Sequence, residues 1–168
     1  MNTKTKYKTL AIYCTAVGIL YLIYGVIEFT NGFITWWTPS ELNIQFGVKI
    51  SEDVYIPNTM ADPFAGLVLI IVGSIILRTA KHVWNENTES WGFATVSLLL
   101  AGAVAVLSIS IITADCLDAY YPLLWGGEPN DLWNFLGDPW SLNPGLVLFP
   151  LTIPLFDIYR KEKAKLDI

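Results

Sequence analysis

Charged residues, cysteines and histidines are scarce in this sequence of 168 residues. Only 15% of the residues are charged, whereas soluble domains usually carry about 25%. The two cysteines, Cys14 and Cys116, form no Cys-x-x-Cys motif, which argues against thiol-redox catalysis and a cysteine-clamped metal. The single histidine, His82, is expected to be exposed in an inner loop and cannot by itself form a haem, zinc or copper site. No cofactor is predicted.

The sequence is instead rich in long apolar runs. A run of about 20 apolar residues is enough for a helix to span a membrane, and the sequence has four runs near that length. They lie at about 10–29, 63–80, 93–113 and 144–159. The pattern predicts an all-α integral membrane protein, a single membrane domain built as a four-transmembrane-helix bundle. Two long outer loops, 30–62 and 114–143, join the spans and leave room for short strands or helices.

The cations lie almost entirely on one side of the predicted membrane. Nine of the ten lysines and arginines flank the apolar runs in three short segments, and Lys49 is the exception. The nine are Lys4, Lys6, Lys8, Arg78, Lys81, Arg160, Lys161, Lys163 and Lys165. Cytoplasmic loops carry such an excess of lysine and arginine. We therefore predict that both termini are cytoplasmic and that the protein lies in the plasma membrane.

The predicted outer loops are acidic and aromatic. Nine carboxylates fall in these loops or at their edges, and so do five of the seven tryptophans. The carboxylates are Glu41, Glu52, Asp53, Asp62, Asp115, Asp118, Glu128, Asp131 and Asp138. The basic segments are short and juxtamembrane, which fits the lipid bilayer rather than a nucleic acid. We expect the outer face to meet a membrane-protein partner or a second copy of the chain.

Glu28 is the most informative single residue, because a carboxylate inside a span is a functional hypothesis by default. Tyr21 shares its helix face and is expected to orient it. Glu28 would serve as a proton carrier, a cation ligand or a contact to a partner subunit. The alternative is that Glu28, near the end of its apolar run, sits at headgroup level and reaches water.

Three aspartates at the outer rim extend this hypothesis. Asp62, Asp115 and Asp138, together with Glu28, would offer oxygen ligands of the kind that calcium or magnesium prefers. The competing interpretation is that Asp62 and Asp138 cap helices before proline and that Asp115 is solvated. Both interpretations remain open at this stage.

Aromatic residues in the second outer loop suggest a binding surface. Trp125 and Trp133 lie in mid-loop, where a lipid-interface belt explains them less well than it explains Trp36, Trp37 and Trp140. With Asp115 and Asp118 they are candidate contacts for a ligand or a partner protein.

Small residues and prolines predict how the spans pack. Gly18 and Gly25 share one face of the first span, and Gly66 and Gly73 recur at a spacing of seven in the second. Pro150 and Pro154 should kink or break the fourth span.

The two halves of the chain resemble each other. Gly-Leu-Val-Leu occurs at 66–69 and at 145–148, offset by 79 residues, while the Asp-Pro pairs at 62–63 and 138–139 are offset by 76. These similarities are consistent either with a duplicated hairpin or with chance.

Three functions remain open. Without a recognisable catalytic constellation, the sequence favours a non-enzymatic subunit or scaffold that docks a partner through its acidic, aromatic outer loops. One alternative is a small cation or proton carrier or channel that uses Glu28 and the rim carboxylates. The other is a membrane enzyme that acts on lipid or quinone at the outer face.

Overall fold

The computed structural model describes residues 3–38, 44–51, 54–129, 133–138 and 140–156. These residues are mostly helical, as predicted. The elements in chain order are α1 (Thr3–Trp37), β1 (Val48–Lys49), β2 (Tyr55–Ile56), α2 (Pro63–Trp84), α3 (Ser90–Tyr120), η1 (Tyr121–Trp125), α4 (Pro144–Leu148) and η2 (Phe149–Thr152). Three helical segments are long and apolar enough to cross a membrane, namely Tyr7–Trp37, Pro63–Trp84 and Ser90–Trp125.

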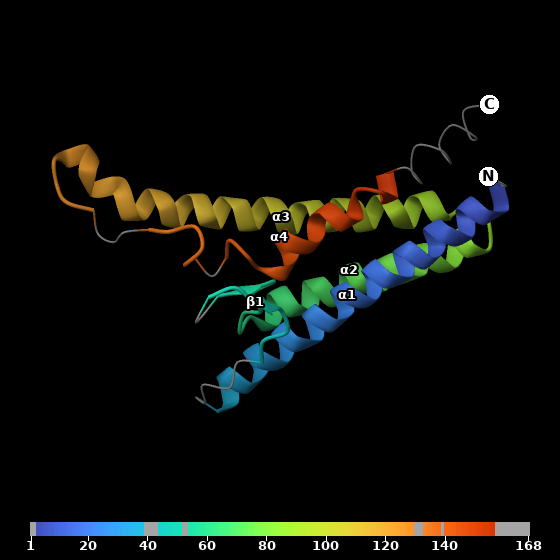
Figure 1. The fold of residues 1–168 in the computed structure, drawn as a ribbon, viewed down its shortest axis with the longest axis horizontal. Coiled ribbons are helices and arrows are strands. Elements are labelled where there is room, and N and C mark those ends of the chain that lie inside the picture. The colour runs from blue at the N-terminus through green and yellow to red at the C-terminus, as the bar shows by residue number, and fades with distance from the viewer. Residues whose placement is uncertain (1–2, 39–43, 52–53, 130–132, 139, 157–168) are drawn as a thin grey trace.

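The helices form two pairs that diverge toward one end of the molecule (Figure 1). α1 runs along α2 in one pair, and α4 runs along α3 in the other. A short connection joins α2 to α3 at the end where the N-terminus also lies (Figure 1). The hairpin and the segment that leads into α4 lie toward the other end, between the diverging pairs. The predicted outer segments therefore gather away from the N-terminus.

Glycines bring the backbones of α1 and α2 into close contact. A Cβ atom built on Gly25 would lie 2.8 Å from the carbonyl oxygen of Gly66, and one on Gly66 would lie 2.7 Å from that of Gly25. Gly18 and Gly73 repeat this relationship further along the helices, at 3.1 and 2.9 Å. Close approach of this kind between membrane helices depends on small residues. The contacts confirm the predicted seam.

All three long helices extend beyond the apolar runs that predicted them, and two of them extend far. α1 ends at Trp37 and α3 at Tyr120, both inside segments predicted as outer loops. An apolar run ends where the membrane core ends, but a helix continues until a residue breaks it or its packing is lost. Gly32 packs against Pro63 and so gives the outer end of α1 a neighbour, while Pro122 follows the end of α3.

Two prolines interrupt the helix in the fourth apolar run, as predicted. α4 ends at Leu148 after 5 residues, and η2 follows with Pro150 near its start. Proline removes a backbone donor and its ring clashes with the preceding turn, and Pro154 continues the disruption. The description ends at Phe156, so the end of the predicted fourth span and the basic tail lie outside the described residues. The fourth span stays a prediction.

A short hairpin forms in the first of the predicted outer loops, where the sequence left room for short strands. β1 and β2 pair antiparallel, with Val48 opposite Ile56 and Lys49 opposite Tyr55. The Lys49 ammonium lies 5.9 Å from the centroid of the Tyr55 ring, within cation–π range. Lys49, the one cation predicted for the outer loops, is thus engaged at the hairpin.

The expectation that His82 is exposed was wrong. Its ring stacks on Phe93 with 4.9 Å between centroids, and its Nδ1 lies 3.6 Å from Glu89 Oε2. The short connection between α2 and α3 brings both partners over the last turn of α2, which leaves the His82 side chain 16% exposed.

Candidate functional site

Amide side chains hold the first outer segment against α1. Asn31 is fully buried, and its Nδ2 donates to the Ile44 carbonyl oxygen (2.9 Å) while its Oδ1 accepts from the Ile44 N–H (3.0 Å). Gln45 makes the same paired contact with the backbone of Thr59, at 2.9 and 3.1 Å. The Asn31 pair therefore ties the segment to α1, and the Gln45 pair ties the two ends of the segment to each other.

Glu28 is buried beneath this segment. It is 2% exposed, and its Oε1 accepts a hydrogen bond from the Met60 N–H at 3.2 Å. Tyr21 does not orient it, because the buried Tyr21 hydroxyl has no hydrogen-bond partner among the described residues. The two residues share a face but are separated by roughly 10 Å along the helix axis. Glu28 is an interior residue of the fold rather than a solvated one at its edge.

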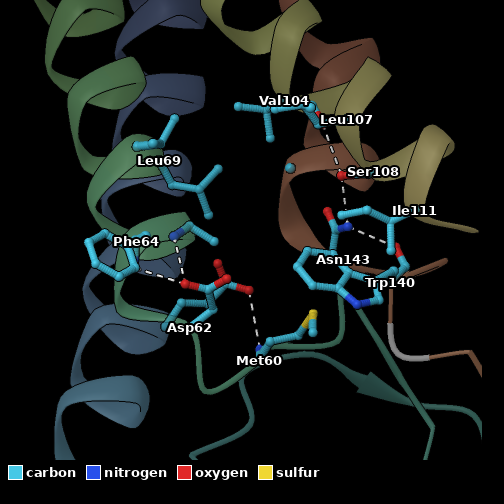
Figure 2. Close-up of a pocket in the computed structure, with 14 residues that line it drawn as sticks. Met60, Asp62, Phe64, Leu69, Val104, Leu107, Ser108, Ile111, Trp140 and Asn143 are labelled. Carbon is cyan, nitrogen blue, oxygen red and sulfur yellow. Dashed lines mark hydrogen bonds between the residues drawn. The ribbon is translucent and has the colours of Figure 1, made fainter.

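A cavity of about 270 Å³ lies beside Glu28, between the two helix pairs (Figure 2). Apolar side chains from both pairs and from the loops make most of its wall. They include Phe64, Leu69, Val104, Leu107, Ile111 and Trp140. Figure 2 shows α2 side chains on one side, α3 side chains on the other, and Met60 and Trp140 approaching from the loops. Its polar lining residues are Glu28, Asp62, Ser108 and Asn143.

Two of these polar residues cap helices. Asp62 Oδ1 accepts from two N–H groups in the first turn of α2, at 2.9 and 3.0 Å, which confirms its predicted capping role. Asn143 Oδ1 accepts from Leu146 N at 2.8 Å, and its Nδ2 donates to Ser108 Oγ at 2.9 Å. Sequence reasoning missed Asn143 and Ser108, although asparagine before proline is an N-cap signal.

Asp138 organises the second outer segment. It is buried, its Oδ2 accepts from Trp133 Nε1 at 2.9 Å, and its Oδ1 accepts from the Trp140 N–H at 2.8 Å. Asp138 therefore closes a turn, whereas the sequence had suggested that it caps a helix. The Asn58 N–H donates to the Leu142 carbonyl oxygen at 2.7 Å, so a direct hydrogen bond joins the two outer segments.

The four carboxylates considered for a cation site are not all brought together. Glu28 and Asp62 line the same cavity. Asp138 is engaged in its own turn, and Asp115 lies on the exposed surface of α3. In the described ranges, no three histidine, cysteine or acidic side chains are arranged to hold a metal ion. The geometry gives no support to the four-carboxylate site.

The C-terminal end of α3 and the following η1 form an exposed surface, residues 115–128, which we call the α3 tip. Leu124 and Trp125 are each 77% exposed, and Tyr121 is 56% exposed. Among the other predicted binding residues, Asp115 and Asp118 lie exposed on the same tip, whereas Trp133 is half-buried against Asp138. The α3 tip projects beyond the rest of the molecule (Figure 1).

Comparison with known proteins supports the membrane assignment. Residues 4–163 match a family model described as MJ0565 integral membrane domain. No curated protein and no solved structure matches the chain significantly. The family match includes all three apolar helices that are long enough to cross a membrane. The chain is therefore an integral membrane protein in contact with a lipid bilayer, and it belongs to the MJ0565 integral membrane domain family.

Proposed function

We propose that this protein is a non-enzymatic subunit or scaffold of the plasma membrane that docks a partner membrane protein through the α3 tip. The observation that carries the proposal is the exposure of Leu124 and Trp125, at 77% each. They follow directly on a long helix, with Tyr121 nearby and also exposed. Tryptophan and tyrosine dominate the energetically important positions of protein interfaces, and clustered exposed apolar side chains mark interaction sites.

Charge on the α3 tip favours one kind of partner. Asp115, Asp118 and Glu128 are exposed beside the aromatic residues, and the α3 tip carries no lysine or arginine. Complementary potentials across an interface favour a partner with a basic surface. A second copy of the chain would bring like charges together, so a different protein suits this surface better than a homo-oligomer.

The orientation and the fourth span are part of the same proposal. The cations Lys81 and Arg78 lie near the end of α2, and the N-terminus lies at the same end of the molecule (Figure 1). The positive-inside rule then favours a cytoplasmic N-terminus and an outer α3 tip. A fourth span over 144–159 would return the C-terminus to the cytoplasm, in line with the basic tail.

Site-specific photo-crosslinking in the native membrane tests the docking proposal. A photoreactive amino acid would replace Trp125 or, as a control, Leu99, which is 67% exposed in the middle of α3. We expect a discrete protein adduct from position 125 and only lipid adducts from position 99. The double charge reversal Asp115→Lys with Asp118→Lys should abolish the protein adduct, because it would repel a basic partner. The reversal Glu86→Lys, in the connection between α2 and α3 and so at the end of α3 away from the tip, should leave it intact.

Three results would count against docking to a basic partner. The first is the absence of a protein adduct at position 125. The second is an adduct that survives both reversals on the α3 tip. The third is an adduct of twice the mass of the 18.8 kDa chain, which would mean that copies of this chain pair there.

The carrier alternative keeps one observation in its favour. Glu28 is buried inside the fold and lines a cavity between the helix pairs. A transported cation or proton would have to reach this carboxylate and leave it again. The carrier alternative thus concerns the cavity, whereas the docking proposal concerns the α3 tip.

A further inference from the structure

Among the polar side chains that line the cavity, every donor has a partner within the described residues, whereas some acceptor oxygens have none. Ser108 donates to the Val104 carbonyl oxygen and accepts from Asn143, whose Nδ2 also donates to the Trp140 carbonyl oxygen. Glu28 uses one carboxylate oxygen, Oε1, to accept from Met60 N. The hydrogen bonds that Asp62 accepts within the described residues all go to its Oδ1. The lining groups with an oxygen still able to accept a hydrogen bond are therefore the carboxylates of Glu28 and Asp62.

These carboxylates lack a cationic neighbour in the part of the chain that the structure describes. The contact of a carboxylate with a basic side chain that is found there joins Glu89 to His82, at the other end of α2. Lys49 lies over the Tyr55 ring. A buried carboxylate with a single hydrogen bond is unfavourable unless a proton or a cation neutralises it. Asp62 lines the same cavity and adds a second carboxylate for such a cation.

The rest of the cavity suits an organic cation better than a bare metal ion. Trp140 and Phe64 present aromatic rings to it, together with aliphatic side chains from α2 and α3 (Figure 2). Aromatic faces attract ammonium groups, and apolar walls attract a short hydrocarbon body. A metal ion would need more oxygen ligands than these two carboxylates supply.

We propose that the cavity is a binding site for an organic monoammonium ligand, with Glu28 and Asp62 facing the ammonium group and the aromatic and aliphatic walls holding its apolar part. The volume of about 270 Å³ lies just below the usual range for drug-sized ligands, about 300–1,000 Å³. The ligand is therefore small: a free alkyl- or arylalkyl-amine, or the ammonium headgroup of a membrane lipid. The site is separate from the α3 tip, so either proposal stands without the other.

A set of three isosteric probes tests the charge requirement. The full chain would be placed in nanodiscs of phosphatidylglycerol, which has no ammonium headgroup, and labelled with 5-fluorotryptophan. The ¹⁹F signal of Trp140, assigned with Trp140→Phe, reports on the cavity wall. Titration with n-hexylammonium should shift this signal saturably, while 1-hexanol and hexanoate should not. Saturable shifts of equal size with 1-hexanol, or with sodium or magnesium ions alone, would overturn the proposal.

Conservative variants tie the shift to the named carboxylates. Glu28→Gln keeps an acceptor for Met60 N, and Asp62→Asn keeps a good helix cap, so both variants should fold. Each should weaken hexylammonium binding by about 10- to 100-fold, the usual effect of losing a charged hydrogen-bond partner. Asp115→Asn, a control carboxylate outside the cavity, should change nothing. Unchanged affinity in both cavity variants would overturn the site.

The same signal distinguishes the two sources of ammonium. If a lipid headgroup occupies the site, discs of phosphatidylethanolamine should show the shifted Trp140 signal before any titration, and Glu28→Gln should restore the unshifted position. If the ligand is a free amine, the two kinds of disc should start alike and bind hexylammonium alike. Either result supports an ammonium site and identifies its source.

Discussion

Gly66 on α2 packs directly against Gly25 on α1, and the carbonyl oxygen of each occupies the place that a Cβ atom on the other would take. The Cβ position on Gly66 is also blocked by the backbone of Phe29. None of these obstacles is a flexible side chain, so the two helices would have to move apart to admit a methyl group.

The variant Gly66→Ala should therefore destabilise the protein despite the better helix propensity of alanine. Overpacking of this kind typically costs about 1–3 kcal/mol. Gly92→Ala is the matched control, since a Cβ there meets nothing within 4 Å. It should be neutral or stabilising by about 0.5–1 kcal/mol. Reversible unfolding in mixed detergent measures both, and equal stabilities would mean that the α1–α2 contact is looser than described.

Asn31→Ala should release the first outer segment without disrupting the helices. The change removes both hydrogen bonds between Asn31 and Ile44, each worth about 0.5–1.5 kcal/mol, while the Thr59 hydroxyl still donates to the Ile44 carbonyl oxygen. We expect faster hydrogen exchange over residues 44–60 and unchanged exchange in α2. Thr30→Ala, which loses only a bond to the carbonyl oxygen of Val26 within α1, should leave that exchange unaltered. Unchanged exchange in Asn31→Ala would contradict the anchoring role.

Ser108 and Asn143 should be energetically coupled, because their side chains are hydrogen-bonded at 2.9 Å across 35 positions of sequence. A double-mutant cycle with Ser108→Ala and Asn143→Ala should give a coupling energy of about 0.5–1.5 kcal/mol. Ser110→Ala is the control, since Ser110 bonds only the Val106 carbonyl oxygen of its own helix. It should be additive with Asn143→Ala, and additivity of the Ser108 pair would show that α4 is not fastened to α3 in this way.

One helix–helix contact recurs at the 79-residue offset of the two Gly-Leu-Val-Leu segments. Gly66 packs against Gly25, and Gly145 packs against Val104, the residues 79 positions further on. Each half also starts its second helix with a side-chain cap before proline, Asp62 in one and Asn143 in the other. These parallels favour a duplicated hairpin, which stays a hypothesis.

The sequence predicted the helical content, the glycine seam and the proline breaks, because periodicity and residue geometry determine these locally. It did not predict where α1 and α3 end, since hydropathy marks the membrane boundary rather than the end of a helix. The sequence also did not predict that Glu28 is buried. This burial depends on a segment that returns from thirty residues away, held by Asn31 and Gln45, and no local pattern encodes that contact.

Docking through the α3 tip requires that this tip lie outside the cell. Single cysteines at Trp125 and at Glu86, in a chain with Cys14→Ala and Cys116→Ala, can be tested with a membrane-impermeant maleimide. We predict that Trp125→Cys is labelled in intact cells and that Glu86→Cys is labelled only after permeabilisation. Labelling of Glu86→Cys in intact cells, with Trp125→Cys protected, would place the α3 tip in the cytoplasm and contradict the proposed orientation.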